Sequence, residues 1–266
     1  MLSRLRRQVA DVEGDILEAE VADLAPLDGG GFLARTGDRT IQTRTVLLAT
    51  GVVDKAPVLP GIEPVIRRGL LGQCPICDGY EHTGQRIAIL GDGAHAQREA
   101  VFISRYSRPV SLICLTAAAL TPDAPQENAF TTAAEEGLVR RLDSPVAEAR
   151  LQADGSVALL LKDGAGHVFD VLYSAVGCRP QAALASPLGA SQDSSGHLVV
   201  DARCRTSVPG LYAAGDVASA LDQLAVAVGH GAIAATAIHN HCREIEAGTA
   251  SLPSPAPLSV EIASVR

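Results

Sequence analysis

The chain has 266 residues, of which 47% are hydrophobic and 20% charged, and this is the balance of a globular protein with a buried core. Its 22 basic and 30 acidic residues give a formal net charge of −8, which argues against nucleic-acid binding because phosphates need clustered Lys and Arg. No stretch reaches the ~18 uninterrupted apolar residues of a membrane span, and the first residues lack the apolar core of a secretory signal. Six cysteines are few for this length, so we expect no disulfide scaffold, no metal site and a cytoplasmic protein.

The N-terminal part is expected to form a short basic helix over residues 2–10 and then an antiparallel meander. Its strands are expected at Ile16–Leu24, Phe32–Thr36 and Thr40–Ala49, because turn residues separate these alternating runs. The end of the last run, 45–51, is apolar enough to be buried on both faces.

The middle of the chain repeats this pattern. A short buried strand at Arg86–Leu90 leads through a glycine loop into a helix over 94–106, and Pro109–Leu115 is a second buried strand. A second meander follows over residues 145–177 and ends on Gly177, much as the first ends on Gly51. The interval from Gly91 to Gly177, applied to Gly51, puts the first copy's glycine loop before Met1, so the first copy is either built differently or begins inside a domain.

The C-terminal part is expected to hold a strand at Gly196–Val200, a strand within 206–216, and a long helix from about Gln223 to Arg243. The apolar run Leu224–Ile238 predicts that this helix is buried. The Pro- and Ser-rich tail after residue 248 is expected to be disordered. Three histidines in polar, turn-like stretches are expected at the surface, and a fourth, in the apolar helix, is a minor candidate for proton handling near a cofactor: His82, His167 and His197, and His230.

Cys74-Pro75-Ile76-Cys77-Asp78 is the first motif that carries chemistry. Two thiols separated by two residues can close a tight disulfide at the start of a helix, where the helix N-terminus favours the reactive thiolate. Asp78 is placed to deliver a proton to a leaving thiolate. Half of a zinc site or two core cysteines are the alternatives, but no second close pair accompanies the motif, so a redox pair is favoured.

Gly91-Asp92-Gly93, followed by Ala96, is the second motif, and it joins a strand to a helix. Gly91 would make the tight turn, Gly93 would let a pyrophosphate approach the backbone, and Ala96 would allow close helix–strand packing. An ordinary strand–helix turn is the alternative. No Lys, Arg or His occurs between Thr116 and Val139, so the adenosine end of a nucleotide has no evident charged partner.

Gly215-Asp216, at the end of an apolar run, is the third motif. Gly215 would give access to the backbone, and Asp216 would accept hydrogen bonds from a polyol hydroxyl. The helix that starts near Gln223 would direct its positive end to this spot, which suits a ring that gains negative charge on reduction. An Asp that caps a helix without any ligand is the alternative.

These motifs, in this order and together with Leu47–Gly51 and Pro60-Gly61, resemble the low-molecular-weight thioredoxin reductases over residues 1 to about 245. The resemblance implies an α/β fold of two Rossmann-like three-layer domains, one inserted in the other. An FAD-binding domain, incomplete at its N-terminus, would comprise 1–62 and 180–266, and an NAD(P)-binding domain with the cysteine pair would comprise 63–179. It further implies FAD, more weakly NAD(P)H, a thioredoxin-like or small dithiol or disulfide substrate, a homodimer, and no nucleic-acid or membrane partner.

The same resemblance assigns roles to residues. Cys77 looks like the thiol beside the flavin, Cys74 like the thiol that attacks the substrate disulfide, and Asp78 like the acid/base. The cofactor-binding residues would be Thr50, Gly51, Gly91, Gly93, Ala96, Gly215, Asp216, Gln223 and Leu224.

Three departures from this family keep other functions open. The N-terminal glycine loop that cradles the ADP half of FAD is absent, and no basic motif for an NADPH 2′-phosphate follows Leu115. The loop from Cys74 to Glu81 looks like that of related flavin-dependent dithiol oxidases, which pass electrons to oxygen and need no nicotinamide. We therefore expect a flavin-dependent disulfide reductase, with a dithiol oxidase and a non-catalytic, flavin-free nucleotide-binding remnant as the alternatives.

Overall fold

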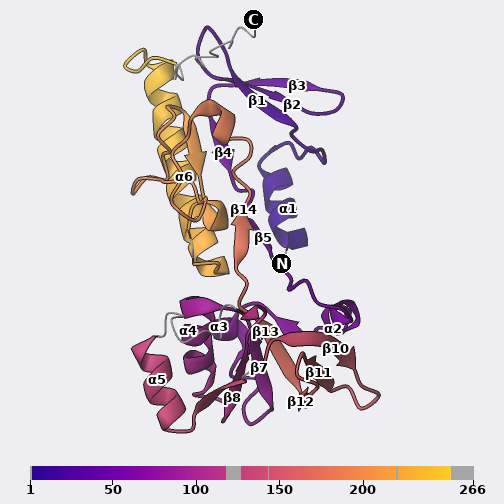
Figure 1. The fold of residues 1–266 in the computed structure, drawn as a ribbon. Coiled ribbons are helices and arrows are strands. Elements are labelled where there is room, and N and C mark those ends of the chain that lie inside the picture. The colour runs from indigo at the N-terminus through magenta and orange to yellow at the C-terminus, as the bar shows by residue number, and fades with distance from the viewer. Residues whose placement is uncertain (1, 118–126, 143, 220, 253–266) are drawn as a thin grey trace, which may run out of the picture. The chain divides into compact units, whose positions relative to one another are not determined.

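The computed structural model describes residues 2–117, 127–142, 144–219 and 221–252. The chain folds into two compact units, one formed by Met1–Val53 with Arg179–Arg266 and the other by Asp54–Cys178 (Figure 1). The chain passes between them in β5 (Val52–Asp54) and β14 (Cys178–Pro180), which pair as a two-stranded sheet. The middle of the chain is thus inserted into a unit made of its two ends.

The unit Asp54–Cys178 is built around a five-stranded sheet in the order β6-β13-β7-β8-β9, in which neighbouring strands are parallel. Every residue of β7, β8 and β13 is buried, as expected for short apolar runs covered on both faces. In chain order the strands are β6 (Leu71–Gly72), β7 (Ile87–Leu90), β8 (Val110–Ile113), β9 (Val139–Leu142) and β13 (Val171–Ser174).

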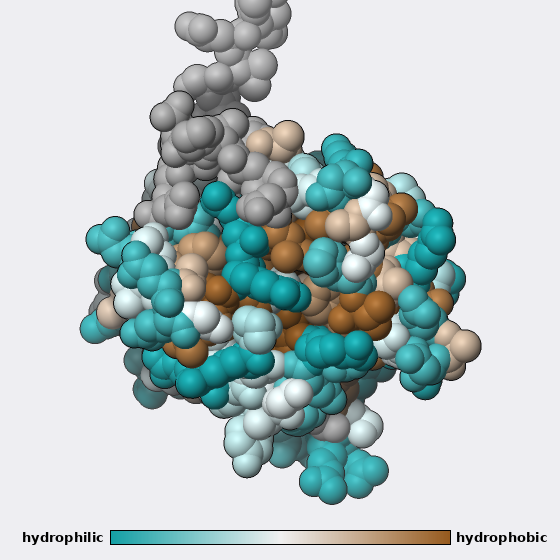
Figure 2. Space-filling model, turned by 60° about the horizontal axis from the view of Figure 1, so that its bottom comes forward, coloured by the Kyte–Doolittle hydropathy of each residue, from teal (hydrophilic) through white to brown (hydrophobic). Residues whose placement is uncertain are grey.

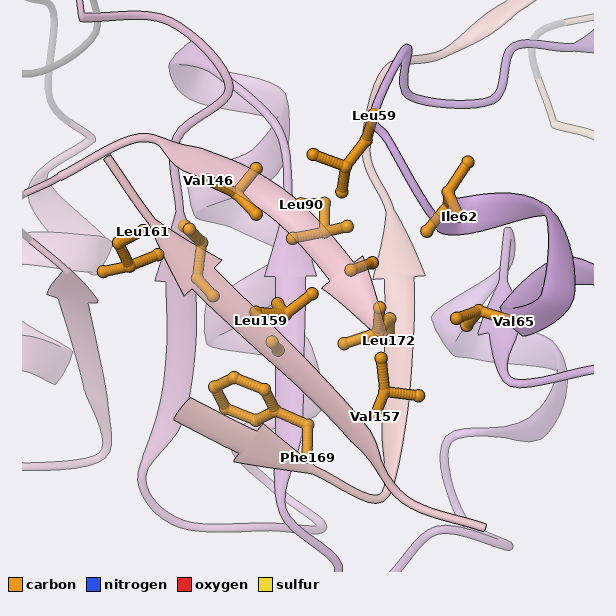
Figure 3. Close-up of a cluster of buried hydrophobic side chains, with 13 residues drawn as sticks. Leu59, Ile62, Val65, Leu90, Val146, Val157, Leu159, Leu161, Phe169 and Leu172 are labelled. Atoms are coloured by element: carbon orange, nitrogen blue, oxygen red, sulfur yellow. The ribbon is translucent and has the colours of Figure 1, made fainter. Parts of the chain in front are cut away.

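Side chains alternate between the two faces of this sheet. Leu90 and Leu172 point into a core closed by an antiparallel meander and helix α2 (Ile62–Arg67), which Figure 3 shows. Ile89 and Tyr173 point into a second core on the opposite face. The meander consists of β10 (Val146–Leu151), β11 (Val157–Leu161) and β12 (Gly166–Phe169), and helices α4 (Gly93–Ile103) and α5 (Asn128–Glu135) cover the other face.

The surface in Figure 2, which brings the lower end of Figure 1 forward, is mixed: hydrophobic side chains lie between hydrophilic ones. The short helix α3 (Pro75–Asp78) of the same unit follows β6 directly and spans a single turn.

The second unit has the same three kinds of layer around a smaller parallel pair, β4 (Val46–Leu48) with β15 (Leu211–Ala213). An antiparallel meander and the 3₁₀ turn η2 (Ser186–Leu188) contribute to the core on one face, and α6 (Leu224–Glu246) packs on the other. The meander consists of β1 (Asp23–Pro26), β2 (Phe32–Arg35) and β3 (Thr40–Thr43), and helix α1 (Leu2–Asp11) precedes it. The fold class inferred from the resemblance, α/β with Rossmann-like three-layer units, is confirmed.

Several expected elements differ from the structure. The third strand of each meander is not continuous: the run Thr40–Ala49 divides into β3 and β4, and the run that ends at Gly177 divides into β12 and β13. In each case the first piece pairs antiparallel in the meander and the second enters the parallel sheet. Of the run Ile16–Leu24 only the end is a strand, because β1 begins at Asp23, and Gly196–Val200 makes one isolated bridge through Leu198.

Helix α6 forms where it was expected, but it is not buried. Ala234 is its one fully buried residue, and Leu224 and Val228 are more than half exposed. Its glycines and alanines offer little side chain to the sheet, so it packs through a narrow stripe. None of the described helices is long and apolar enough to cross a membrane. His197, expected at the surface, is buried, and most of the expected disordered tail lies outside the described residues.

Candidate redox and cofactor sites

Cys74 and Cys77 form a disulfide, with sulfurs 2.04 Å and Cα atoms 5.3 Å apart. Strand β6 ends at Gly72, Cys74 is extended at the start of α3, and Pro75 occupies the first position of the turn, where its missing N–H costs nothing. The Cys77 N–H donates to the Cys74 carbonyl (2.9 Å), which closes the loop. Cys74 is half-buried and Cys77 exposed, so the bond is accessible from solvent.

Four other cysteines take part in no disulfide within the described part of the chain: Cys114, Cys178, Cys204 and Cys242. Burial, with a smaller effect of Asp92, raises the pKa of Cys114 to about 11, and burial also raises the pKa of Cys204. Since the thiolate is the reactive form, these two thiols are inert near neutral pH. Within the unit Asp54–Cys178, the 74–77 pair is the disulfide that the described residues form.

Asp78, the last residue of α3, is held by a residue far away in the sequence. The Tyr173 hydroxyl donates to Asp78 Oδ1 at 2.6 Å, and Tyr173 itself is fully buried on β13. Burial first, and then this hydrogen bond, raise the pKa of Tyr173 well above its usual value. Two exposed apolar side chains, Ile76 and Tyr80, flank the same loop and offer contact area to a docking substrate.

The glycine loop joins β7 to α4 as its sequence predicted, and its members differ in surroundings. A Cβ on Gly91 would lie 2.8 Å from the carbonyl of Ala175, which directly follows the neighbouring strand β13, so Gly91 permits a close approach of the two strand ends. Gly93 has a φ of +72° and open space where a Cβ would stand, which leaves room for a phosphate against the backbone. Ala96 is fully buried and allows α4 to lie close to the sheet.

Asp92, between the two glycines, already accepts hydrogen bonds from the backbone. Its Oδ1 accepts hydrogen bonds from the backbone N–H groups of Leu115 (2.8 Å) and Thr116 (3.4 Å), just after β8. This places a carboxylate where an adenosine ribose would meet the end of the second strand. A 2′-phosphate there would face a negative charge, and the described residues 115–117 supply no cation to offset it.

The Gly215-Asp216 motif forms a 3₁₀ turn, η3 (Gly215–Val217), directly after β15. Gly215 has a φ of +73°, and a Cβ there would press on Ala227 of α6, so glycine is required. Asp216 Oδ1 is buried and has no hydrogen-bond partner among the described residues. A buried carboxylate oxygen without a donor fits the hydroxyl group of a bound polyol such as the ribityl chain of FAD.

His230, held as a minor candidate, belongs to the packing of this turn. Its Nδ1 accepts a hydrogen bond from the Gly215 N–H (3.4 Å), and its carbonyl accepts one from Cys204 Sγ (3.6 Å). Gln223 caps α6 and Leu224 begins it, 59% exposed.

Thr50 and Gly51 lie just after β4, in the same unit. The Thr50 hydroxyl donates to the Gln181 carbonyl (2.6 Å), and the Gln181 N–H donates to the carbonyl of Gly51 (2.9 Å), whose φ is +68°. Both residues are thus hydrogen-bonded to the backbone of Gln181, which directly follows β14.

Sequence patterns did not single out Tyr173, which contacts Asp78 beside the cysteine pair, or Glu99, whose charge acts on Tyr173. Tyr173 was one apolar position in a buried strand, and Glu99 was one charge on a helix. In the structure Tyr173 bonds Asp78, and Glu99 lies on α4 with Oε1 3.1 Å from His95 Nε2 and Oε2 buried without a partner among the described residues. A hydroxyl on the last strand of a repeat, facing the helix side of the sheet, is the one signal that could have drawn attention to Tyr173.

Known proteins resemble this chain over most of its length. The family model described as pyridine nucleotide-disulphide oxidoreductase matches residues 7–231. A thioredoxin reductase of Listeria monocytogenes is 26% identical over 237 residues, which are 88% of this chain and 72% of the relative. Thioredoxin reductases from Streptococcus pyogenes and T. acidophilum have crystal structures that are 25% and 30% identical, with TM-scores of 0.79 and 0.52; each comparison covers 91% of this chain, and 79% and 80% of the other.

Thioredoxin reductases are FAD-dependent and use NADPH. Together with the Cys74–Cys77 disulfide they make this chain a thiol-disulfide oxidoreductase that resembles thioredoxin reductase. The chain belongs to the pyridine nucleotide-disulphide oxidoreductase family.

Proposed function

We propose that the protein is a flavin-dependent disulfide reductase in which electrons pass from NAD(P)H through FAD to Cys74–Cys77 and on to a substrate disulfide. The observation that carries the proposal is the solvent-accessible disulfide with a carboxyl group, Asp78, in the next position. A carboxyl beside a disulfide can supply the proton that a leaving sulfur needs.

The proposed cofactor sites follow the two units. Residues 1–62 and 180–266 would bind FAD, with Asp216 on the ribityl hydroxyls, Gly215 giving close backbone approach, and Thr50, Gly51, Gln223 and Leu224 completing the site. Residues 63–179 would bind the nicotinamide nucleotide, with Gly93 at the pyrophosphate and Gly91 and Ala96 shaping the loop. The unfilled hydrogen-bonding capacity of Asp216 and the open space at Gly93 support these roles.

FAD, when bound, supplies a two-electron carrier between the nucleotide and the disulfide. Two electrons break the Cys74–Cys77 bond, Asp78 gives a proton to the Cys77 sulfur, and the Cys74 sulfur stays a thiolate. The Cys74 thiolate then attacks the substrate disulfide, and one substrate sulfur leaves as a thiolate. The Cys77 thiol returns its proton to Asp78 and its sulfur attacks Cys74, which re-forms the disulfide and releases the second substrate sulfur; the two substrate sulfurs take protons from water to give the dithiol.

A dithiol oxidase is the second candidate, because Asp92 stands at the adenosine end of the nucleotide loop and no cation occurs between Thr116 and Val139. The reaction would run in the opposite direction: a substrate dithiol becomes a disulfide, and its two electrons and two protons reduce oxygen to hydrogen peroxide. No nicotinamide would be needed.

Anaerobic addition of NADH or NADPH to the purified protein separates these functions. The reductase predicts that a bound flavin is bleached, and an unbleached flavin would contradict it. The oxidase predicts hydrogen peroxide from a dithiol in air with no nicotinamide present. A protein that stays colourless after FAD is added would be the flavin-free nucleotide-binding remnant.

We also propose a thioredoxin-like protein or a small dithiol or disulfide as the substrate, in a homodimeric, cytoplasmic enzyme. Exposed Ile76 and Tyr80 beside the disulfide support a substrate with an apolar contact surface. Dithiol formation on a thioredoxin and on a small disulfide, measured side by side with NADH or NADPH, tests the choice. Equal rates would remove the preference for a protein partner.

A further inference from the structure

Tyr173 contacts the proposed acid but takes no part in the mechanism above. We propose that Tyr173 is a positioning residue that holds Asp78 in place for proton transfer at the Cys74–Cys77 pair. The carrying observation is the 2.6 Å hydrogen bond from the Tyr173 hydroxyl to Asp78 Oδ1. The inference rests on the proposed acid/base role of Asp78 and deepens it.

The two partners differ in how firmly their own backbone is fixed. Tyr173 belongs to β13, which pairs with β6 on one side and β7 on the other, and it is fully buried. Asp78 ends a helix of a single turn, whose own hydrogen bonds hold it weakly. The sheet therefore fixes the position of the Tyr173 hydroxyl, and the hydrogen bond from this hydroxyl holds the Asp78 carboxylate in place.

The Tyr173 ring is itself enclosed by two neighbours. A Cβ on Gly72 would lie 2.6 Å from the ring, so the ring rests directly against the backbone of β6, two residues before Cys74. The His82 ring meets it edge-on with centroids 6.1 Å apart, and His82 Nδ1 lies 2.8 Å from Gln85 Oε1. Glycine at 72 thus makes space for the tyrosine that supports the redox loop.

The hydrogen bond also selects which oxygen of Asp78 carries the proton. With Oδ1 accepting from Tyr173, Oδ2 is the oxygen that gives a proton to a sulfur when two electrons break the S–S bond. The carboxylate left behind keeps the tyrosine hydroxyl as its hydrogen-bond donor. Burial raises the pKa of Tyr173, so the hydroxyl keeps its own proton throughout the cycle.

Other charged groups act on the same hydroxyl. Glu81 and Glu99 both raise the pKa of Tyr173 through their negative charges, after burial and Asp78. Glu99 Oε1 lies 3.1 Å from His95 Nε2, so protonation of His95 changes the electrostatic effect of Glu99 on Tyr173. A pH profile of the redox pair must therefore be compared between variants that leave these groups in place.

The test substitutes Tyr173→Phe, which removes the hydroxyl and keeps the ring. Tyr106→Phe is the matched control, because that ring packs against Phe102 and Tyr80 in the same unit without holding Asp78. The protein is reduced with a phosphine, and the rate at which iodoacetamide alkylates Cys74 and Cys77 is followed by peptide mass between about pH 5 and pH 9. In Tyr173→Phe the midpoint of the profile should move up by about one pH unit, because the Asp78 carboxylate loses its hydroxyl donor and its less compensated negative charge disfavours the neighbouring thiolate.

The proposal is overturned if Tyr173→Phe and Tyr106→Phe both follow the wild-type profile. In the Asp78→Asn background, adding Tyr173→Phe should change nothing further; a shift as large as in wild type would show that the hydroxyl acts on another group. The assay needs no nicotinamide and no electron transfer from flavin, so its failure is distinct from failure of the proposed reductase reaction.

A second measurement leaves Tyr173 intact and covers the case in which the Phe variant does not fold. The chain has four tyrosines and no tryptophan, so tyrosine absorbance can be followed by difference spectra during acid titration. The wild type should show a tyrosine perturbation that Asp78→Asn lacks, because the Tyr173 hydroxyl donates to the Asp78 carboxylate. A perturbation that is the same in both proteins would contradict the proposal.

Discussion

The two units share one plan but differ in the size of their parallel sheets. Each has a meander whose last strand leads into a parallel strand, β3 into β4 and β12 into β13. The inserted unit carries five parallel strands covered on both faces, and the other has two. In both, the candidate chemistry follows the ends of parallel strands: the glycine loop follows β7, the cysteine pair follows β6, and Gly215-Asp216 follows β15.

The helices α4 and α6, one from each unit, also differ in how much of their length is buried. Helix α4 has 11 residues and buries Ala96, Gln97, Ala100 and Ile103, whereas α6 has 23 residues and buries Ala234 alone. A loop on a well-packed helix is pre-organised without its ligand, while a loop on a weakly packed one gains order from it. The comparison teaches that α4 is anchored to its sheet along its length, whereas α6 has one fully buried residue and most of its surface free.

The sharpest test of the inserted unit is Cys77→Ser. The variant should lower disulfide-reductase turnover by at least ~1,000-fold, because one sulfur cannot form the disulfide that accepts two electrons. Turnover with NADH or NADPH is the measurement, and any bound flavin should remain. Cys242→Ser, at a free cysteine on α6, is the control. Normal turnover in Cys77→Ser would refute the redox role of the pair.

The sharpest test of the other unit is Asp216→Ala. Its buried Oδ1 has no partner among the described residues, and we expect it to accept a hydrogen bond from a flavin hydroxyl. Loss of a hydrogen bond to a charged group costs about 1.5–3 kcal/mol, so FAD affinity should fall about 10- to 100-fold. Fluorescence titration of the flavin-free protein measures it. Asp216→Asn, which keeps an acceptor oxygen, should lose less; equal affinity in all three proteins would remove Asp216 from the site.

Alanine substitutions at Gly91 and Gly93, in the same loop, should lower stability for different physical reasons. Gly91→Ala should lower the free energy of unfolding by about 2 kcal/mol, because its Cβ would meet the Ala175 backbone. Gly93→Ala should cost about 1 kcal/mol, because only its positive φ is strained. Urea unfolding gives both values. Calorimetric titration with NADH should show the larger affinity loss for Gly93→Ala, and the reverse order would contradict the assigned roles.

The smallest expected effect concerns His95. Its hydrogen bond to Glu99 raises the pKa of His95 in the folded protein, so this pair stabilises the fold fully below the unfolded value of about 6.5 and stops doing so as pH rises through the folded value. The His95 side chain is 55% exposed, so the contribution should stay below about 0.5 kcal/mol. As pH falls from about 8.5 to about 5.5, the free energy of unfolding of the wild type should rise relative to that of Glu99→Gln. A difference independent of pH would contradict the pairing.

Sequence patterns located the glycine loop, the cysteine pair and the long C-terminal helix because each depends on local chemistry. They could not place the break between β3 and β4, since an apolar run looks the same whether it stays in a meander or changes sheets. They predicted burial for α6 from its apolar run, yet what a helix packs against is a property of the whole fold. Tyr173 and Asp78 lie 95 residues apart, so their hydrogen bond leaves no local signature.

The central claim is that reducing equivalents from a nicotinamide nucleotide reach the Cys74–Cys77 disulfide. The direct measurement is to treat the purified, flavin-loaded protein anaerobically with NADH or NADPH, alkylate it, and map the labelled cysteines by mass spectrometry. The account predicts new label on Cys74 and Cys77, with the labelling of the four other cysteines unchanged from the untreated protein. An unlabelled 74–77 pair beside a bleached flavin would show that electrons stop at the flavin and would contradict the account.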